Sequence, residues 1–418
     1  MTSGKGIGVT TDLRSRVESE LRSNILPFWR TRAVDTGRGG FLGRIAHDGT
    51  PDPSAAKGVI LNARILWAFA RSYRYYGGQQ DLDLAHRAFH YIGRHFVDRE
   101  YGGVYWSVDA NGAPADTTKR FYAQAFAVYA LAEFWHAAKE QTALALAFQL
   151  VDCIEAHAHD SDHRGYIEAC ARDWSAAADQ RLSEVDMDEK KSMNTHLHLL
   201  EAYAALLRVH EDARLRVRLR ELIEIFLDRI VDAGTNHFLL FFDERWTPRS
   251  RKVSFGHDIE GSWLLVEAAE TLGDEALLAR VKSVALRMAA AVLDEGIDRE
   301  GGLMYEAEDG AIVDSDRHWW PQAEAVVGFL NAYELCREQR FLDAAERSWR
   351  FIEERIVDRV HGEWFWLVTQ GGHTDAKRDK AGPWKCPYHN ARACFEVMER
   401  LDRLSLADAC ADRATEAK

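Results

Sequence analysis

The chain of 418 residues is long enough for one to three domains of about 150 residues each and can bury a large core. It carries 53 basic and 66 acidic side chains, and its formal net charge of −13 is spread along the sequence, which argues against nucleic acids and anionic membranes as partners. No segment approaches the ~18 apolar residues of a membrane-spanning helix, the N-terminal segment has no apolar signal-peptide region, and the six cysteines form no C-x-x-C pair. These features predict a cytoplasmic protein with reduced thiols.

Glycine with an apolar or aromatic residue one or two positions later recurs at intervals of about 64 residues. The recurring segments are Gly39-Gly40-Phe41, Gly102-Gly103-Val104-Tyr105, Gly165-Tyr166, Gly301-Gly302-Leu303-Met304-Tyr305 and Gly362-Glu363-Trp364. Asn236, His237 and Phe238 fill the remaining gap with the same following pattern but without a glycine. The interval is too long for 34-residue helical-pair repeats and favours a larger unit of two helices and a hairpin.

Two amphipathic stretches belong to each interval, with apolar residues three and four positions apart. In chain order the predicted helices are 14–29, 61–75, 82–97, 123–137, 140–156, 197–210, 215–231, 262–272, 275–293, 321–336, 342–356 and 390–404. Only 8 prolines in the whole chain suit long, uninterrupted helices.

This pattern predicts an all-α protein, an (α/α)6 barrel (toroid) of six helix-pair repeats joined by short β-hairpin loops. An inner ring surrounded by an outer ring is the simplest way to bury both faces of the helices that begin at 61, 123, 197, 262, 321 and 390; an open solenoid is the alternative. We expect a single catalytic domain over 1–418, with an ordered core of about 11–405. Residues 1–10 and 406–418 are expected to be frayed tails.

Polar residues gather at the start of each predicted inner helix, and so they should meet at one mouth of the ring. They are Asn62, Arg64, Tyr122, Gln124, Asn194, His196, His198, His257, Asp258, Glu260, Trp319, Trp320, Gln322, Glu324, His389, Asn390 and Arg392. The N-termini of the helices also present unsatisfied N–H groups and positive dipole ends. The mouth therefore favours a developing anion, which a scaffold protein would not need.

Some of these residues allow other interpretations. His196 and His198 form an H-x-H motif, but on a helix only one of the two can face the axis, so no metal site is expected. Cys386, three residues before His389, could be a nucleophile, although packing is the preferred interpretation. Glu260 follows His257 by three positions and either forms a surface pair or orients the imidazole.

Two reactions suit this set of side chains. Carboxylate pairs for glycosidic cleavage exist, either Glu260 with Glu324 or Asp186 with Glu168, but neither is singled out. Two histidines at different helix starts fit better with removal of a proton from one face of a carbon and its return on the other. A nearby arginine would hold the resulting enolate-like oxygen.

The motifs that carry these residues resemble the N-acylglucosamine 2-epimerase superfamily and, within it, the cellobiose 2-epimerase branch. They are LNARILW at 61–67, YAQAF at 122–126, NTHLH at 194–198, SFGHDIEGSW at 254–263, HWWPQAEA at 318–325 and KCPYHNAR at 385–392. The resemblance runs from about residue 12 to 404 and itself implies an (α/α)6 barrel. Gly261, where the branch commonly has alanine, is a small departure.

The resemblance implies a reaction without metal or other cofactor. His198 matches the position associated with opening of the sugar ring, and His257 and His389 match an acid/base pair on opposite faces of C2. One histidine would remove the C2 proton to give a cis-enediolate, and the other would return a proton after rotation about C2–C3. Arg64 would stabilise the enediolate oxygens.

The same resemblance assigns supporting roles to further residues. Tyr122 would lie near the enediolate and Glu260 would steer the histidine, while Trp320 and Trp384 match aromatic positions that stack on sugar rings. Polar contacts to the sugar are expected from Asp186, Asn194 and Tyr305.

The implied substrates are β-1,4-linked disaccharides, with cellobiose converted to glucosyl-mannose and lactose to epilactose. Alternatives on the same scaffold are a 2-epimerase for free mannose and glucose or for N-acyl hexosamines, and an aldose–ketose isomerase. An (α/α)6 glycoside hydrolase and a non-catalytic sugar-binding protein are further alternatives. The expected partner is a small sugar, and the expected assembly is a monomer or weak homodimer.

Overall fold

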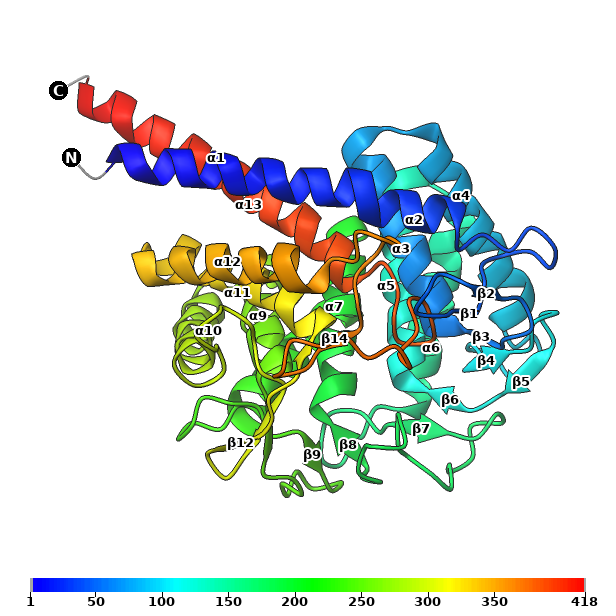
Figure 1. Cartoon of the computed structure of the whole chain (residues 1–418). Coiled ribbons are helices and arrows are strands. Elements are labelled where there is room, and N and C mark those ends of the chain that lie inside the picture. Colours follow the sequence, from blue (N-terminus) through cyan, green and yellow to red (C-terminus); the bar gives the residue numbers. More distant parts are fainter. Residues whose placement is uncertain (1–2, 417–418) are drawn as a thin grey trace.

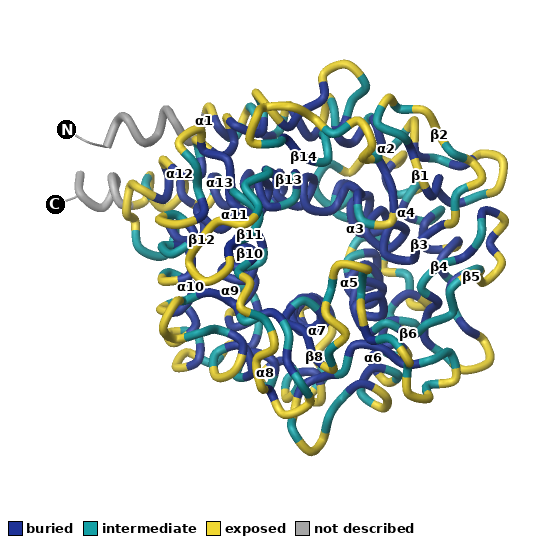
Figure 2. Tube along the Cα trace, turned by 60° about the horizontal axis from the view of Figure 1, so that its bottom comes forward, coloured by how far each residue is buried: buried dark blue, intermediate teal, exposed yellow. Residues whose placement is uncertain are grey.

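Six pairs of antiparallel helices form two concentric rings (Figures 1 and 2). The structure is a computed structural model that describes residues 3–416, with side chains for 12–410. The inner ring consists of α3 (Val59–Tyr76), α5 (Phe121–Ala138), α7 (Met193–Val209), α9 (Phe255–Leu272), α11 (Trp319–Cys336) and α13 (His389–Glu416). The outer ring consists of α1 (Ser3–Glu20) with α2 (Leu26–Thr31), then α4 (Gln79–Tyr91), α6 (Gln141–His157), α8 (Ala213–Ile225), α10 (Glu275–Glu295) and α12 (Gln339–Phe351).

The two rings differ in how their residues are buried, as the sequence pattern predicts. Every residue of α5 from Phe121 to Ala132 is buried, because this helix packs on both the core of the ring and the outer layer. In α8 the buried residues recur at helical spacing, with Leu215, Leu219 and Leu222 on one face. Four outer helices end or continue through a π-helical turn, at Leu21–Ile25, Ile92–Phe96, Phe226–Ile230 and Ile352–Ile356.

The ring is closed, which excludes the open solenoid. Successive inner helices pack against each other from α3 to α13. The last one returns to the first, where Arg71 of α3 binds Glu399 of α13 at 2.6 Å and Tyr75 packs against Phe395. The predicted (α/α)6 barrel is therefore confirmed.

Short strands pair with one another and so connect neighbouring loops around the mouth where the inner helices begin. They are β1 (Arg44–Ile45), β2 (Pro51–Asp52), β3 (Lys57–Gly58), β4 (Ser107–Val108), β5 (Pro114–Asp116), β6 (Lys119–Arg120), β7 (Ala169–Cys170), β8 (Lys191–Ser192), β9 (Phe241–Phe242), β10 (Lys252–Ser254), β11 (Glu306–Glu308), β12 (Ala311–Asp314), β13 (Arg317–His318) and β14 (Leu367–Val368). The strand before an inner helix pairs antiparallel with a strand of the next loop, as β3 does with β4 and β6 with β7. A bridge from Ile45 to Ala381 joins the first loop to the last.

One helix begins well before its predicted start. The fourth inner helix was expected at 262 and begins at Phe255, so that His257 and Glu260 lie within it. Gly256 and Gly261 weaken the helical signal of this segment, because glycine is a poor helix former. Gly261 is required by packing, since a Cβ there would lie 2.2 Å from the ring of Phe238.

At both ends of the chain the structure describes the backbone further than the side chains, which are described for residues 12–410. The backbones of α1 and α13 continue to Ser3 and Glu416, so the predicted frayed tails at 1–10 and 406–418 lie partly outside the described residues. Within the described part, no helix is both long and apolar enough to cross a membrane.

A buried lysine–aspartate pair recurs in four repeats and ties the loop after an outer helix to the strand or loop segment that leads to the next inner helix. The pairs are Lys57–Asp35 at 2.7 Å, Lys119–Asp98 at 2.9 Å, Lys191–Asp160 at 2.8 Å and Lys380–Asp358 at 2.6 Å. All four ammonium groups are almost completely buried. Removing one partner of such a pair leaves an uncompensated buried charge.

We predict that Asp98→Ala lowers the free energy of unfolding by about 3–5 kcal/mol, because it strands the Lys119 ammonium in the interior. Urea unfolding followed by circular dichroism measures this change. The matched control is Asp179→Ala, which removes an exposed carboxylate paired with Arg181 and should have a much smaller effect. An unfolding free energy of Asp98→Ala equal to that of the control would contradict the role of the pair.

Candidate active site

The predicted histidines meet at the end of the ring where the inner helices begin. His198 lies on α7, His257 on α9 and His389 at the start of α13, and His198 and His389 are almost completely buried. The tilted ring of Trp320 on α11 lies between two of them, with its centroid 4.7 Å from that of His257 and 5.4 Å from that of His389. Three repeats that are far apart in sequence thus supply one cluster.

His198 is held by a buried glutamate one turn further along α7. Its Nδ1 lies 3.0 Å from Oε2 of Glu201, and the other oxygen of Glu201 accepts hydrogen bonds from Tyr388 and Arg392. Burial alone would raise the pKa of Glu201, but the charge of Arg392 lowers it to about 2. Because an ionised carboxylate only accepts hydrogen bonds, Nδ1 of His198 carries the proton and Nε2 is left as an acceptor.

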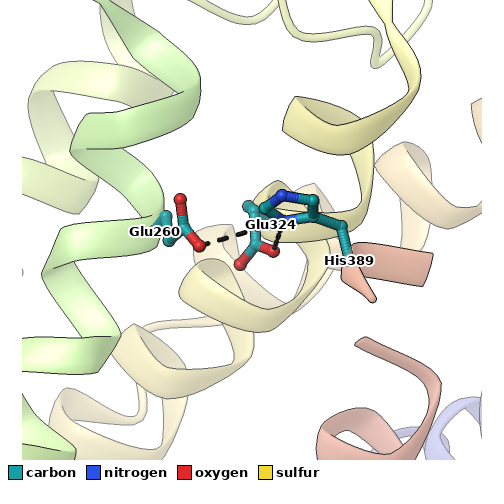
Figure 3. Close-up of side chains that lie close together, drawn as sticks. All are labelled: Glu260, Glu324 and His389. Atoms are coloured by element: carbon teal, nitrogen blue, oxygen red, sulfur yellow. Dashed lines mark hydrogen bonds and ion pairs between the residues drawn. The ribbon is translucent and has the colours of Figure 1, made fainter. Parts of the chain in front are cut away.

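His389 is held in a similar way by Glu324 of α11 (Figure 3). Its Nδ1 lies 2.6 Å from Oε1 of Glu324, and Oε1 of Glu260 lies 3.8 Å from the same nitrogen. Glu324 accepts at both oxygens, from Arg392 at 2.7 Å and from the indole of Trp263 at 3.0 Å. His389 is therefore the donor at Nδ1, and its Nε2 is free to act as a base.

The guanidinium of Arg392 joins these groups into one buried cluster. It donates to Glu201, Glu260 and Glu324, which come from α7, α9 and α11. Burial, together with the charge of Glu324, raises the pKa of Glu260 above its ordinary value. Oε2 of Glu260 is buried without a hydrogen-bond partner among the described residues, which makes it the natural place for a proton in the cluster.

The same cluster has the spacing of a metal site, with ligand atoms of Glu260, Glu324 and His389 all within 4.8 Å of one another. A guanidinium nitrogen of Arg392 already lies 2.5 Å from Glu260 and 2.7 Å from Glu324. The protein thus supplies its own cation at this point, and the donor set does not fit a further one.

His257 has a different partner from the other two histidines. Its Nδ1 lies 2.8 Å from the hydroxyl of Ser254, at the start of α9. Burial lowers the pKa of His257 to about 3 and holds the pKa values of His198 and His389 below the ordinary value as well. All three imidazoles are therefore neutral at pH 7, as a proton-abstracting base must be.

Arg64 of α3 lies near the histidines and is almost completely buried without an ion pair to a described residue. Its guanidinium lies between the rings of Phe126, 4.1 Å away, and Tyr388, 4.7 Å away, and donates to the hydroxyl of Tyr122 at 2.9 Å. It has no carboxylate partner among the described residues, and its weak contact to Cys386 at 3.7 Å adds little. Arg64 therefore suits an anionic oxygen better than a structural ion pair.

Aromatic side chains line the approach to the histidines. Trp384 lies against Tyr122 and Trp106, with ring centroids 5.9 and 5.8 Å apart, and Tyr305 lies 6.4 Å from Trp320. All of these rings except that of Tyr122 are only partly buried, so they can receive a ligand.

The polar residues expected to contact the sugar make no hydrogen bond to the histidines among the described residues. Asn194 is half-buried, and its side-chain oxygen has no hydrogen-bond partner among the described residues. Asp186 accepts a hydrogen bond from Ser183 at 2.7 Å, and its charge acts on Tyr305. Glu168 caps the start of α7 through Ser192 and Thr195, which is a structural use of that carboxylate.

The sequence profile of a family described as N-acylglucosamine 2-epimerase (GlcNAc 2-epimerase) matches residues 40–393. The chain belongs to this family. The resemblance drawn from the motifs is thereby confirmed, and the chain is an enzyme of the isomerase class.

Relatives of this family member cover nearly its whole length. A cellobiose 2-epimerase from Bacteroides fragilis is 46% identical, over 92% of this chain and 98% of that protein. The solved cellobiose 2-epimerase from Spirochaeta thermophila is 40% identical with a TM-score of 0.88, over 97% of this chain and 99% of that one. A solved D-mannose isomerase, 20% identical with a TM-score of 0.80, covers 92% of this chain and 97% of its own and shares the fold.

One expected side-chain pair does not form in this family member, and the preferred interpretation of Cys386 agrees with its contacts. Glu260 was expected to orient His257, but it binds Arg392, and His257 is paired with Ser254. A guanidinium stabilises a buried carboxylate more than a neutral imidazole does, and Glu260 therefore pairs with Arg392 rather than with His257. Cys386 contacts Arg64 and the carbonyl of Trp384 rather than His389, consistent with packing.

Sequence reasoning placed His196 and His198 correctly but missed Glu201. His196 turns away from the axis and accepts the backbone N–H of Tyr166, so the H-x-H motif makes no pair. Glu201 belongs to none of the recognised motifs. Only its position three residues after His198, on the same face of the helix, could have indicated that the two side chains pair. Tyr388 and Arg392 both bind Glu201, which lies 187 and 191 residues before them in the sequence, so local spacing gives no sign of these contacts.

We predict that Glu201→Gln lowers turnover by about 10- to 100-fold, because the amide no longer fixes the tautomer of His198 or balances Arg392. Steady-state kinetics measure the loss, and circular dichroism checks the fold. The control is Glu155→Gln, since Glu155 also accepts tyrosine hydroxyls but on the outer side of α7. Wild-type turnover in Glu201→Gln would contradict this role.

Proposed function

We propose that this enzyme is a sugar 2-epimerase that interconverts glucose and mannose at the reducing end of β-1,4-linked disaccharides. The observation that carries the proposal is the pair His257 and His389, two neutral imidazoles on different helices that lie against the same ring of Trp320. A carbon bound between them can lose a proton to one base and regain it from the other.

The first step is opening of the sugar ring. His198 accepts the hydroxyl proton of O1 at its free Nε2, since Glu201 occupies Nδ1. The proton returns to the ring oxygen as the C1–O5 bond breaks, which gives the open-chain aldehyde. An aldehyde at C1 acidifies the hydrogen on C2.

The second step is the exchange at C2. His257 removes the C2 proton, and the electron pair of the C–H bond forms the C1–C2 double bond of a cis-enediolate whose negative oxygen is held by Arg64. Tyr122, whose hydroxyl accepts from Arg64, can donate its own proton to the same oxygens. After rotation about C2–C3, His389, which has taken a proton from solvent at Nε2, delivers that proton to the opposite face of C2, and Glu324 at Nδ1 stabilises the imidazolium. His257 then releases to solvent the proton that it removed from C2. The roles of His257 and His389 exchange in the reverse direction.

Disaccharides are favoured over free hexoses by the aromatic approach. Trp384 beside Tyr122 and Trp320 beside His389 offer aromatic faces at two points, and each would stack on one ring of a disaccharide. The relatives named cellobiose 2-epimerases at 37–46% identity support the same preference over the D-mannose isomerase at 21% and the N-acylglucosamine 2-epimerase at 24%. We further propose that residues 1–418 act as one catalytic domain in the cytoplasm, as a monomer or weak dimer and without a metal.

We predict that the enzyme, assayed in EDTA, converts cellobiose to glucosyl-mannose and lactose to epilactose. His257→Ala and His389→Ala should each lower turnover by at least ~100-fold while circular dichroism shows an intact fold. Chromatography of the sugars is the measurement, with His163→Ala, a partly buried histidine on a loop away from the cluster, as the control. Release of free glucose would support a glycoside hydrolase, and full activity of His389→Ala would overturn the two-base scheme.

We predict that Trp384→Ala weakens use of cellobiose at least ~10-fold more than use of mannose, because its ring contacts the second sugar. The ratio of kcat/KM for the two sugars measures this effect. Equal losses on both sugars would argue against stacking at the second ring.

A further inference from the structure

The inner helices are tied to the loops beside them by a recurring contact, here called the helix–loop clip. In each clip a side chain near the start of an inner helix accepts the backbone N–H of a loop residue. The described residues include Gln124 with Val104 at 2.8 Å, His196 with Tyr166 at 2.9 Å, Asp258 with Phe238 at 2.7 Å and Gln322 with Leu303 at 2.7 Å.

The clip on α9 differs from the others in carrying a charge. Gln124 and Gln322 are neutral amides that also donate to the carbonyl of the same loop residue, and burial lowers the pKa of His196 to about 4. Asp258 is a carboxylate with no exposed surface, and it directly follows His257 in the sequence. A buried carboxylate requires a partner, or its burial is costly.

His237 supplies that partner from a position where four other repeats have a glycine. Gly103, Gly165 and Gly302 each precede the clipped loop residue, and His237 precedes Phe238 in the same way. Its Nδ1 lies 2.8 Å from Oδ2 of Asp258.

The other ring nitrogen of His237 reaches the surface. Its Nε2 lies 3.2 Å from Glu295 at the end of α10, while Arg287 of the same helix binds the neighbouring Asn236 rather than the imidazole. The charged groups that act on His237 are thus Asp258 from α9 and Glu295 from α10. Burial opposes the charged imidazolium, but these two carboxylates hold the pKa of His237 above its ordinary value.

We propose that His237 is a positioning residue for the reaction, whose imidazolium neutralises Asp258 and so fixes the first turn of α9 and the catalytic His257. The inference rests on the proposed function. It accounts for the histidine at this position in the repeat that carries His257, where four other repeats have a glycine and the last has Glu363. As pH rises through the pKa of His237 the ion pair is lost, so activity should fall on the alkaline side.

Three variants, His237→Gln, His237→Gly and a double variant, test this proposal by C2 exchange on cellobiose. His237→Gln should lower kcat by about 10- to 100-fold with little change in KM, because a displaced base loses its alignment with the substrate. The ratio of wild-type to variant kcat should shrink toward one at alkaline pH. The double variant His237→Gly with Asp258→Gln rebuilds the neutral clip of Gln124 and Gln322, and it should recover most of kcat and lose the alkaline fall.

His159→Gln is the matched control, since His159 also pairs with a carboxylate, Glu221 at 3.0 Å, but on the outer side of the barrel. Wild-type kcat and pH profile in His237→Gln would overturn the proposal, as would a cooperatively folded double variant no faster than His237→Gly. If the double variant does not fold, the pH profile of His237→Gln decides. An imidazole NMR signal absent from His237→Gln should titrate above the ordinary histidine value, a readout independent of substrate. Absence of C2 exchange in the wild-type enzyme would instead refute the proposed function.

Discussion

The geometry of the site depends on one buried guanidinium. Arg392 holds Glu201, Glu260 and Glu324 together, and through them it fixes His198 and His389. Three carboxylates could not be buried side by side without a cation, and a cation could not be buried here without them. Arg392 also lines a cavity of about 650 Å³ where the inner helices end, so this cluster separates the two ends of the barrel.

The loops around the mouth position the first turns of the inner helices near the Arg392 cluster. The recurring lysine–aspartate pairs and the short strands fix each loop to its neighbour, and the bridge from Ile45 to Ala381 completes the circle. The inner helices are thereby held side by side around the centre of the ring (Figure 2). The histidines come from three different helices. The distances between them therefore depend on how firmly the loop contacts hold these helices relative to one another. The stability of the loops is therefore a condition for catalysis, not a separate property.

Much of this arrangement could be predicted from the sequence. The interval of about 64 residues and the two amphipathic stretches in each interval indicate the double ring, and motifs at the helix starts mark His198, His257, His389 and Arg64. Long-range pairing could not be predicted in the same way. Glu260 stands three residues from His257, which favours a local pair, yet the need to neutralise a buried carboxylate gives it to Arg392. Glu201 has the appearance of an ordinary charged helix residue until Tyr388 and Arg392 are folded against it. The contacts expected from Asn194, Asp186 and Tyr305 stay predictions, since they depend on a bound sugar.

The central claim is that a proton leaves C2 of the sugar and is replaced from the protein and solvent. Proton NMR of cellobiose with the enzyme in D2O tests this claim most directly. The account predicts that deuterium appears at C2 of the reducing-end ring as glucosyl-mannose forms, with the glycosidic bond intact. Formation of the epimer with its original C2 proton retained would contradict the account, because an enediolate between two exchangeable histidines cannot conserve that hydrogen.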